Sequence, residues 1–208
     1  MIDLLQAIRG RRSARDFKQD PVSGGTLFKL LSAASWAPSA MNEQSWHFTI
    51  VTDKTVLGEI SGRAKTWLLE NLPPMPHQTH FRDTLADPDF DIFYNAPSLV
   101  VISTVSDGLW MREDAALAAQ NLMLMATALG LGSCWIGFAQ EWLNTVEGHQ
   151  LLNLPREKLV VAPIIVGHPR TIPPPVARKP PLVSWIGHRH DHDPLKESPF
   201  ENPSPRMQ

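Results

Sequence analysis

Apolar residues recur along the chain with two spacings, one typical of helices and the other of strands. Recurrence every three or four residues, as at Leu4, Leu5 and Ile8, places apolar side chains on one face of a helix. This spacing predicts helices at 3–9, 23–37, 53–68, 111–129 and 142–152. Alternating patterns and short β-branched runs predict strands at 46–52, 98–104, 133–138, 159–167 and 182–186.

Residues that favour helix ends support these boundaries. Ser23 and Asp53 are good N-cap residues, whereas Gly10 and Gly130 are expected to end the helices before them. The helix at 111–129 is apolar on most of its circumference, so we expect it to be central in the fold.

The order of these elements predicts an α+β or α/β sandwich with about four core strands. We expect one domain at 1–170 and a proline-rich C-terminal arm at 171–208, whose strand at 182–186 could add to the sheet of a partner subunit. The segment 72–94 contains several prolines and is long for a connection within a domain, which predicts a lid or a disordered loop.

Composition narrows the class of protein. The 208 residues include one cysteine, which excludes an intrachain disulfide and favours a reducing, cytoplasmic compartment. The opening Met1-Ile2-Asp3 lacks the basic residues of a secretory signal, and no apolar run reaches the roughly 18 residues of a membrane span. The net charge of -2 gives no general attraction to nucleic acid, so any anion site must be local.

Three arginines and a serine lie close together just after the first predicted helix, at Arg11, Arg12, Ser13 and Arg15. Guanidinium groups bind phosphate through paired hydrogen bonds, and a neighbouring hydroxyl adds a donor. Short charged runs are also common on solvated surfaces. From the residues alone, the segment is either a phosphate site or a basic turn.

The loop at 36–46 is polar and is bounded by two tryptophans. Ser39, Asn42 and Gln44 offer neutral donors and acceptors, which suit the edge of a flat heteroaromatic ring better than a phosphate. The same composition is typical of a plain connection between a helix and a strand. The residues alone leave both interpretations open.

The glycine-rich segment 130–137 is not a dinucleotide-binding fingerprint. That fingerprint needs glycine where Trp135 stands, and it joins a strand to a following helix rather than the reverse. We expect these glycines to cap the helix and to let the backbone approach a ligand closely. A nicotinamide cofactor would then be a visiting substrate.

Several other polar residues favour structural roles. Cys134 is expected to be a small buried residue, and Gln120 and Asn121 to satisfy buried polar groups. The alternating histidines and acids at 188–193 could bind a transition metal, but a flexible tail is the favoured interpretation. A group of histidines and aromatic residues in or beside the predicted lid is expected to shape substrate access, namely His77, His80, Phe81, Phe90, Phe93 and Tyr94.

Taken together, four segments resemble the nitroreductase family of flavin mononucleotide (FMN) enzymes, and the resemblance spans most of the chain. These segments lie in the order of the family at 11–15, 37–48, 120–137 and 164–169, with Arg178 and Lys179 following. The resemblance implies a homodimer of α+β subunits, each with a central mixed, mostly antiparallel sheet flanked by helices. It also implies two flavin sites at the dimer interface and an exchanged C-terminal arm that adds a strand to the partner subunit.

The resemblance implies a role for each matching residue. Arg11, Arg12 and Ser13 would hold the FMN phosphate, and Arg178 and Lys179 would return from the arm to the same group. Arg15 would lie near the pyrimidine edge of the ring, where positive charge stabilises the reduced flavin. The loop of the other subunit would contact the ring through Pro38, Ser39, Ala40 and Asn42. Ile136 and Gly137 would pass near the reactive N5 atom of the ring.

Two features depart from the pattern of the family. Ser45 stands where proline often precedes the tryptophan that ends the loop, so we expect a freer loop here. Residues 62–71 offer no evident polar contact for the pyrimidine ring. Both departures weaken any inference about the substrate, and neither removes the phosphate contacts.

The implied activity is that of an FMN-dependent oxidoreductase with ping-pong kinetics. NAD(P)H would reduce the flavin and leave, and a small-molecule acceptor such as a nitroaromatic compound or a quinone would then take the electrons. Such a transfer requires mainly close positioning, so no catalytic nucleophile and no metal are expected. Two alternatives stay open: a non-catalytic flavin-binding or sensing protein, and a flavin enzyme of different chemistry, either reductive dehalogenation or flavin fragmentation.

Overall fold

The computed structural model describes residues 2–71, 79–105, 108–184 and 186–187. The chain divides into two units, 1–173 and 174–208. The first unit contains every described helix and strand, whereas residues 174–184 of the second have neither. The predicted strand at 182–186 is therefore not formed at its described residues 182–184, and its addition to a partner's sheet stays a prediction. The segment 188–193, expected to be a flexible tail rather than a metal site, lies outside the described residues.

A four-stranded sheet forms the centre of the first unit. Its strands are β1 (His47–Val51), β2 (Ser98–Val105), β3 (Gly132–Trp135) and β4 (Lys158–Gly167), in the order β1-β2-β4-β3. All three neighbouring pairs are antiparallel, with Ile50 opposite Val100 and Val100 opposite Ile164. The predicted α+β sandwich is confirmed, although the sheet of the described strands is wholly antiparallel rather than mixed.

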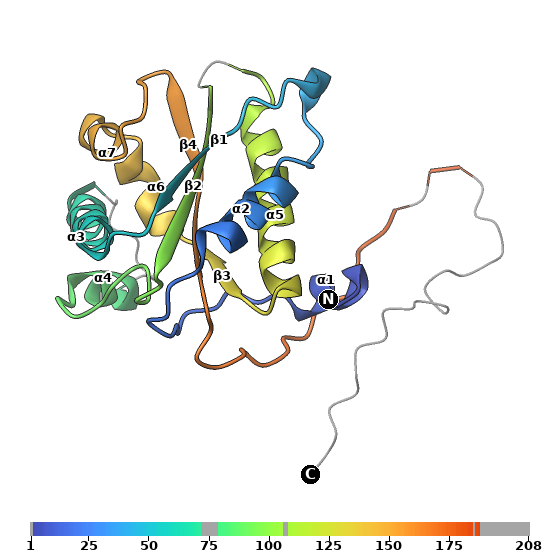
Figure 1. Ribbon diagram of the computed structural model, residues 1–208, viewed down its shortest axis with the longest axis horizontal. Coiled ribbons are helices and arrows are strands. Elements are labelled where there is room, and N and C mark those ends of the chain that lie inside the picture. Colours follow the sequence, from blue (N-terminus) through green and yellow to red (C-terminus); the bar gives the residue numbers. More distant parts are fainter. Residues whose placement is uncertain (1, 72–78, 106–107, 185, 188–208) are drawn as a thin grey trace, which may run out of the picture. The chain divides into compact units, whose positions relative to one another are not determined.

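Helices cover both faces of this sheet (Figure 1). One side carries α1 (Leu4–Gly10), α2 (Gly24–Ala34) and α5 (Met111–Ala128). The other carries α3 (Lys54–Asn71), α4 (Thr79–Ala86), α6 (Gly137–Leu143) and α7 (Val146–Leu151). Strand β2 serves both faces because its side chains alternate: Leu99 and Val101 pack with α3 and α6, and Val100 and Ile102 with α2 and α5.

The predicted caps explain where several helices begin and end. Ser23 accepts a hydrogen bond from the Thr26 amide at the start of α2, and Asp53 accepts from the Thr55 and Val56 amides at the start of α3. Gly130 follows α5 with a φ of 74°, a left-handed conformation that suits glycine. Gly10 is a small exception, since it is the last residue of α1 and Arg11 is the C-cap.

Helix α5 is central, as its apolar circumference predicts. Ala115, Ala118, Leu122 and Ala126 are fully buried. Asn121 also behaves as expected, because its side-chain amide donates to the Ala33 carbonyl of α2 at 3.3 Å. The expectation for its neighbour is wrong, since Gln120 is exposed.

Three stretches differ from the predicted elements. The strand predicted at 133–138 ends at Trp135. The Ile136 amide still donates to the Pro163 carbonyl of β4, and Gly137 then begins α6. The helix predicted at 142–152 is two helices, divided where the Asn144 side chain bonds to the backbone of Val160. The segment 72–94, predicted to be a lid or disordered, contains helix α4, and residues 72–78 lie outside the described part.

No helix among the described residues is long and apolar enough to cross a membrane.

Candidate functional site

Residues 11–19, called the strap here, follow α1 and run across the ends of β3 and β4. The Ala14 amide donates to the Ser133 carbonyl at 3.0 Å, and the Lys18 amide donates to the His168 carbonyl at 2.8 Å. The Arg170 amide donates back to the Asp16 carbonyl at 3.0 Å. These bonds fix the backbone of the segment in which the sequence predicts phosphate-binding residues.

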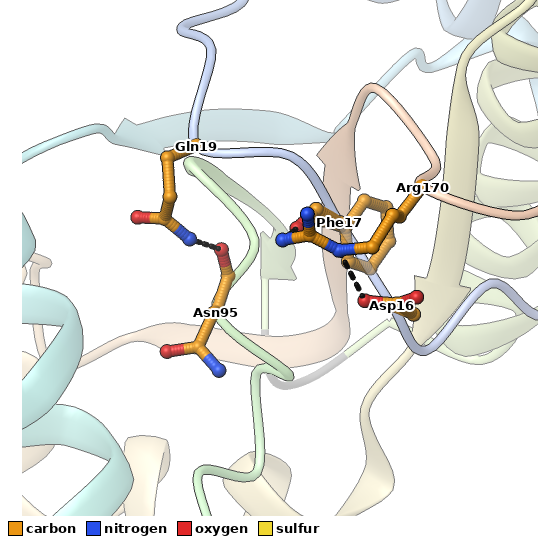
Figure 2. Close-up of polar contacts among 5 residues, drawn as sticks. All are labelled: Asp16, Phe17, Gln19, Asn95 and Arg170. Atoms are coloured by element: carbon orange, nitrogen blue, oxygen red, sulfur yellow. Dashed lines mark hydrogen bonds and ion pairs between the residues drawn. The ribbon is translucent and has the colours of Figure 1, made fainter.

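Side chains add to this attachment (Figure 2). Arg170 donates from Nε to the Asp16 carboxylate at 3.1 Å and from Nη2 to the Phe17 carbonyl at 3.1 Å. Further along the strap, Gln19 donates from Nε2 to the Asn95 carbonyl at 3.0 Å. The strap is thus joined both to the end of β4 and to the turn that precedes β2.

Phe17 anchors the strap in the core. The side chain is 1% exposed and lies against two glycines at the strand ends. A Cβ atom on Gly132 would lie 2.7 Å from Ala14 Cβ and 3.1 Å from Phe17 Cε1, and one on Gly167 would lie 2.8 Å from Phe17 Cδ1. Gly132 therefore allows the strap to approach β3, which corrects the expectation that it admits a ligand.

The strap brings Arg11, Arg12, Ser13 and Arg15 to one edge of the fold. Arg12 donates from Nη1 to the Arg9 and Arg11 carbonyls at 2.6 and 2.9 Å, so part of its guanidinium supports the end of α1. Neither Arg11 nor Arg15 forms an ion pair with a described residue. Their positive charge is available to an external anion.

Two titratable side chains lie within reach of this charge. Burial raises the pKa of the Cys134 thiol, and Arg15, Ser13 and Arg11 partly offset that rise. Burial also raises the pKa of the Tyr94 phenol, again with Arg15 acting in the opposite direction. Cys134 is 3% exposed, which agrees with its predicted role as a small buried residue.

Ser133 adds an unused hydroxyl beside the strap. It pairs with Ser13 through a parallel bridge, and its Oγ is buried with no hydrogen-bond partner among the described residues. Buried hydroxyls normally have a partner, so an unpaired one needs an explanation.

The loop at 36–46 has a strained backbone. Met41, Asn42 and Gln44 have φ values of 52°, 56° and 50°, in the left-handed region that side chains usually avoid. The Ala40 amide donates to the buried Asp114 carboxylate at 3.1 Å, and the Gln44 amide donates to the Ser39 hydroxyl at 3.0 Å. The loop is thus held in one conformation from its base.

Ser45, which stands where proline is common in the family, has a side-chain partner. Its hydroxyl lies 3.0 Å from the Thr104 hydroxyl near the end of β2. The expectation of a freer loop stays a prediction.

The predicted ring contacts Ile136 and Gly137 follow β3 directly. Ile136 is 4% exposed and its amide is used by Pro163, whereas Gly137 is exposed, with no atom within 4 Å of the position of a Cβ. The next residue, Phe138, packs edge-on against Phe81 of α4, with ring centroids 5.1 Å apart. Gly137 thus offers open backbone surface beside an aromatic pair.

The loop at 36–46 and the residue that precedes the strap contact opposite ends of α5. Ala40 of the loop bonds to Asp114 in the first turn of the helix, and Gly10, which precedes the strap, lies against Thr127 in the last turn. At 1.5 Å per residue, about 20 Å of helix separates these two contacts. The predicted phosphate residues and the predicted loop residues are therefore not brought together within one chain.

Arg178 and Lys179 lie in the second unit and are exposed. Their return to the strap stays a prediction.

Two concave surfaces of about 500 Å³ each contain none of the predicted site residues. One lies around His149 and Arg156, and the other lies between α3 and Trp142. Among the described residues, no group of three or more histidine, cysteine or acidic side chains could hold a metal ion.

Sequence reasoning misses three contributors to this region. Asp114 is detectable as an acid in a mostly apolar helix, since such a residue needs a partner when buried. Phe17 leaves no local signal, and Gly132 is noticed only as part of a glycine-rich segment, because the roles of both depend on contacts between distant segments.

Comparisons with known proteins agree with this geometry. The family model described as "Nitroreductase family" matches residues 8–168. The chain is 30% identical over 198 residues to a nitrobenzene nitroreductase from Ectopseudomonas oleovorans, covering 77% of this chain and 84% of that protein. It is 28% identical over 197 residues to an iodotyrosine deiodinase from Thermotoga neapolitana, covering 88% and 97%.

A solved structure is similar over nearly its whole length. The crystal structure of a nitroreductase with bound FMN from Bacteroides fragilis superposes with a TM-score of 0.78 and 26% identity. The match covers 90% of this chain and 100% of that one.

Proposed function

Because the chain belongs to the nitroreductase family, we propose that it is an FMN-dependent oxidoreductase that takes electrons from NAD(P)H and passes them to a small electron-poor acceptor. The observation that carries this proposal is the strap, which fixes three arginines and a serine beside an unpaired buried hydroxyl. Bound FMN would supply the two-electron exchange, and the chain would bind and orient it.

The donor set of the strap suits a phosphate monoester. Arg11 has no ion-pair partner among the described residues, and Ser13 and Ser133 contribute hydroxyls on adjoining segments. Guanidinium and hydroxyl donors together are typical of phosphate sites. We assign the phosphate contacts to Arg11, Arg12 and Ser13, with Arg178 and Lys179 of the arm completing them.

Arg15 would act at the other end of the flavin. A fixed positive charge near the pyrimidine edge stabilises the negative charge that reduction places there. Arg15 is exposed and forms no ion pair with a described residue, so its charge is not neutralised in advance. In this role Arg15 acts through its charge and transfers no proton.

A homodimer would complete the site. Pro38, Ser39, Ala40 and Asn42 lie about 20 Å along α5 from the strap, so these residues would have to reach a flavin held by the strap of another chain. The strained loop supports this role, because backbone strain concentrates at binding sites.

Exposed apolar side chains support the same assembly. Leu4, Ile8, Phe28 and Leu117 are 44–71% exposed and belong to α1, α2 and α5, which lie on one side of the sheet (Figure 1). Large exposed apolar side chains that gather on one side of a protein commonly mark an interface.

NAD(P)H and the acceptor would visit the same open surface in turn. The segment 130–137 is not a dinucleotide-binding motif, and Gly137 presents exposed backbone there. Ile136 and Gly137 would border the reacting part of the ring. A quinone would take two electrons and two protons to become a hydroquinone, and a nitro group would take the same to become a nitroso group and water.

Rapid mixing under anaerobic conditions tests this function. The FMN-loaded protein should lose its visible flavin absorbance on mixing with NADH or NADPH and regain it with a quinone or nitrobenzene. Double-reciprocal plots of the steady-state rate should be parallel, as ping-pong kinetics requires. A protein that binds FMN but is reduced by neither nucleotide would contradict the enzyme proposal and favour the sensing alternative.

A second chemistry is favoured by one observation, the similarity to an iodotyrosine deiodinase. In a reductive dehalogenation, two electrons and a proton replace the carbon–halogen bond with a carbon–hydrogen bond and release halide. Halide release from a halogenated phenol, measured beside quinone reduction, distinguishes this activity from the first.

A further inference from the structure

Tyr94 packs against the exposed Arg15 side chain. The Arg15 Cζ atom lies 5.9 Å from the centre of the Tyr94 ring, within the range of a cation–π contact. The ring itself is half-buried and is fixed by an edge-on contact with Phe90, whose ring centroid is 5.7 Å away. A flexible arginine thus lies beside a rigid aromatic surface.

The backbone around Tyr94 is strained and closely held. Tyr94 and Asn95 have φ values of 53° and 57°. The Asp91 carboxylate accepts hydrogen bonds from the Phe93 amide at 3.0 Å and the Asn95 amide at 2.8 Å, and the Asp91 carbonyl accepts from the Tyr94 amide at 2.9 Å. Such conformations persist where their surroundings enforce them, and they concentrate at functional sites.

The same turn is attached to the strap. Gln19 of the strap donates to the carbonyl of Asn95, the residue after Tyr94 (Figure 2). This bond connects the turn to the segment that carries Arg15. Gln19 also accepts a hydrogen bond from Lys54 at 2.8 Å, which links α3 to this junction. The distance between the Tyr94 ring and the Arg15 backbone is therefore fixed from both sides.

We propose that Tyr94 is a positioning residue whose ring holds the Arg15 guanidinium where it can act on the pyrimidine edge of FMN. The inference rests on the proposed function and extends it to a residue outside the segments that resemble the family. Without the ring, Arg15 would sample many rotamers in solvent, and its ordering would have to occur on cofactor binding.

Matched variants test this role through FMN affinity. Tyr94→Leu removes the aromatic face but keeps apolar bulk, and Tyr94→Phe keeps the face. We expect Tyr94→Leu to weaken the binding of reduced FMN about two- to fivefold more than that of oxidised FMN, the range of an exposed cation–π contact. Tyr94→Phe keeps the aromatic face but loses the phenol that also interacts with Arg15, so its effect should be smaller than that of Tyr94→Leu. Fluorescence and anaerobic titrations of the apoprotein give both dissociation constants.

A double-mutant cycle separates positioning from a merely structural role. In an Arg15→Gln background, Tyr94→Leu should leave the ratio of the two dissociation constants unchanged. An equal effect in both backgrounds, or a Tyr94→Phe variant that behaves like Tyr94→Leu, would overturn the inference. Failure of the wild type to bind FMN would instead overturn the proposed function.

A measurement on the protein without FMN remains informative even if Tyr94→Leu does not fold. Tyr94 is the only tyrosine of the chain, so its ionisation can be followed by ultraviolet absorbance without overlap from another phenol. Burial raises the pKa of this phenol, and Cys134 and Asp91 raise it by smaller amounts. Arg15 acts in the opposite direction and lowers the pKa. Arg15→Gln should therefore raise the pKa of Tyr94, and an unchanged titration would show that the contact is absent.

Discussion

At the scale of single residues, the strap combines a fixed backbone with unpaired charge. Backbone hydrogen bonds hold Ala14 and Lys18 against β3 and β4, while Arg11 and Arg15 form no ion pair with a described residue. Fixing the backbone in advance lowers the entropy cost of binding an anion. The arrangement predicts that affinity depends on a few side chains whose removal leaves the fold intact.

The first residue-scale prediction concerns Arg11. Hydrogen bonds to charged groups contribute about 1.5–3 kcal/mol, so Arg11→Ala should weaken FMN at least about tenfold. Isothermal titration calorimetry measures the affinity, and the melting temperature of the apoprotein should stay near that of the wild type. Arg63→Ala is the matched control, because it removes an arginine whose ion pair with Glu59 lies on α3.

The second residue-scale prediction concerns Cys134. Burial raises the pKa of its thiol despite the nearby Arg15, so little thiolate exists near neutral pH. We expect slow alkylation of the native protein, with a rate that rises as the pH approaches the elevated pKa. Arg15→Gln removes an opposing charge and should slow alkylation further. Rapid labelling of native protein at neutral pH, equal to that of urea-unfolded protein, would contradict this assignment.

At the scale of elements, the helices show what local patterns can predict. Leu57, Ile60, Ala64 and Leu68 are spaced for one helical face, and all four are buried in α3. Ser23 and Asp53 cap the helices that they precede, because their side chains satisfy free amides within the same turn. Such signals depend on near neighbours and can therefore be recognised in sequence.

The errors arise where distant contacts decide the structure. Residues 136–138 continue the apolar pattern of a strand, yet Gly137 begins α6, which packs against α3 and β4. The prolines of 72–94 predict a lid or a disordered loop, so the sequence prediction misses helix α4. This helix packs against α6 through Phe81 and Phe138. In the candidate site, the cluster of arginines makes residues 11–15 recognisable in the sequence. The anchoring of the strap by Phe17 depends on packing between distant segments and cannot be recognised from neighbouring residues.

The prediction at this scale concerns the packing of the strap. Gly132→Ala would place a Cβ atom 2.7 Å from Ala14 Cβ, and overpacking of this kind costs roughly 1–3 kcal/mol. We expect reduced stability in urea and weaker FMN binding, because the strap must shift away from β3.

Gly62→Ala provides the comparison. No atom lies within 4 Å of its Cβ position in α3, so alanine should stabilise that helix by roughly 0.5–1 kcal/mol. Equal stability of the two variants would contradict close packing at Gly132.

At the scale of the whole molecule, the two segments proposed to bind flavin lie near opposite ends of α5 within one chain. Asp114 holds the loop at one end and Thr127 lies beside Gly10 at the other. Assembly into a dimer is the simplest way to bring a strap and a loop together, and the exposed apolar residues of α1, α2 and α5 provide a surface for it.

The prediction at this scale concerns the arm. A chain ended after Pro173 should dimerise more weakly and lose FMN, because it lacks both the segment proposed to be exchanged and the proposed phosphate contacts Arg178 and Lys179. The full-length Arg178→Ala/Lys179→Ala variant should lose FMN affinity but remain dimeric. Sedimentation velocity and flavin absorbance report the two properties separately, and an unchanged dimer after truncation would contradict the exchange of the arm.

The attachment of the strap to β4 also constrains the order of events on the ribosome. Residues 16–18 emerge early, but their hydrogen-bond partners at 168–170 are translated some 150 residues later, and contacts of such long sequence separation form slowly. The backbone of residues 16–18 can therefore reach its partners only after residues 168–170 have left the exit tunnel. Cofactor capture would accordingly be post-translational.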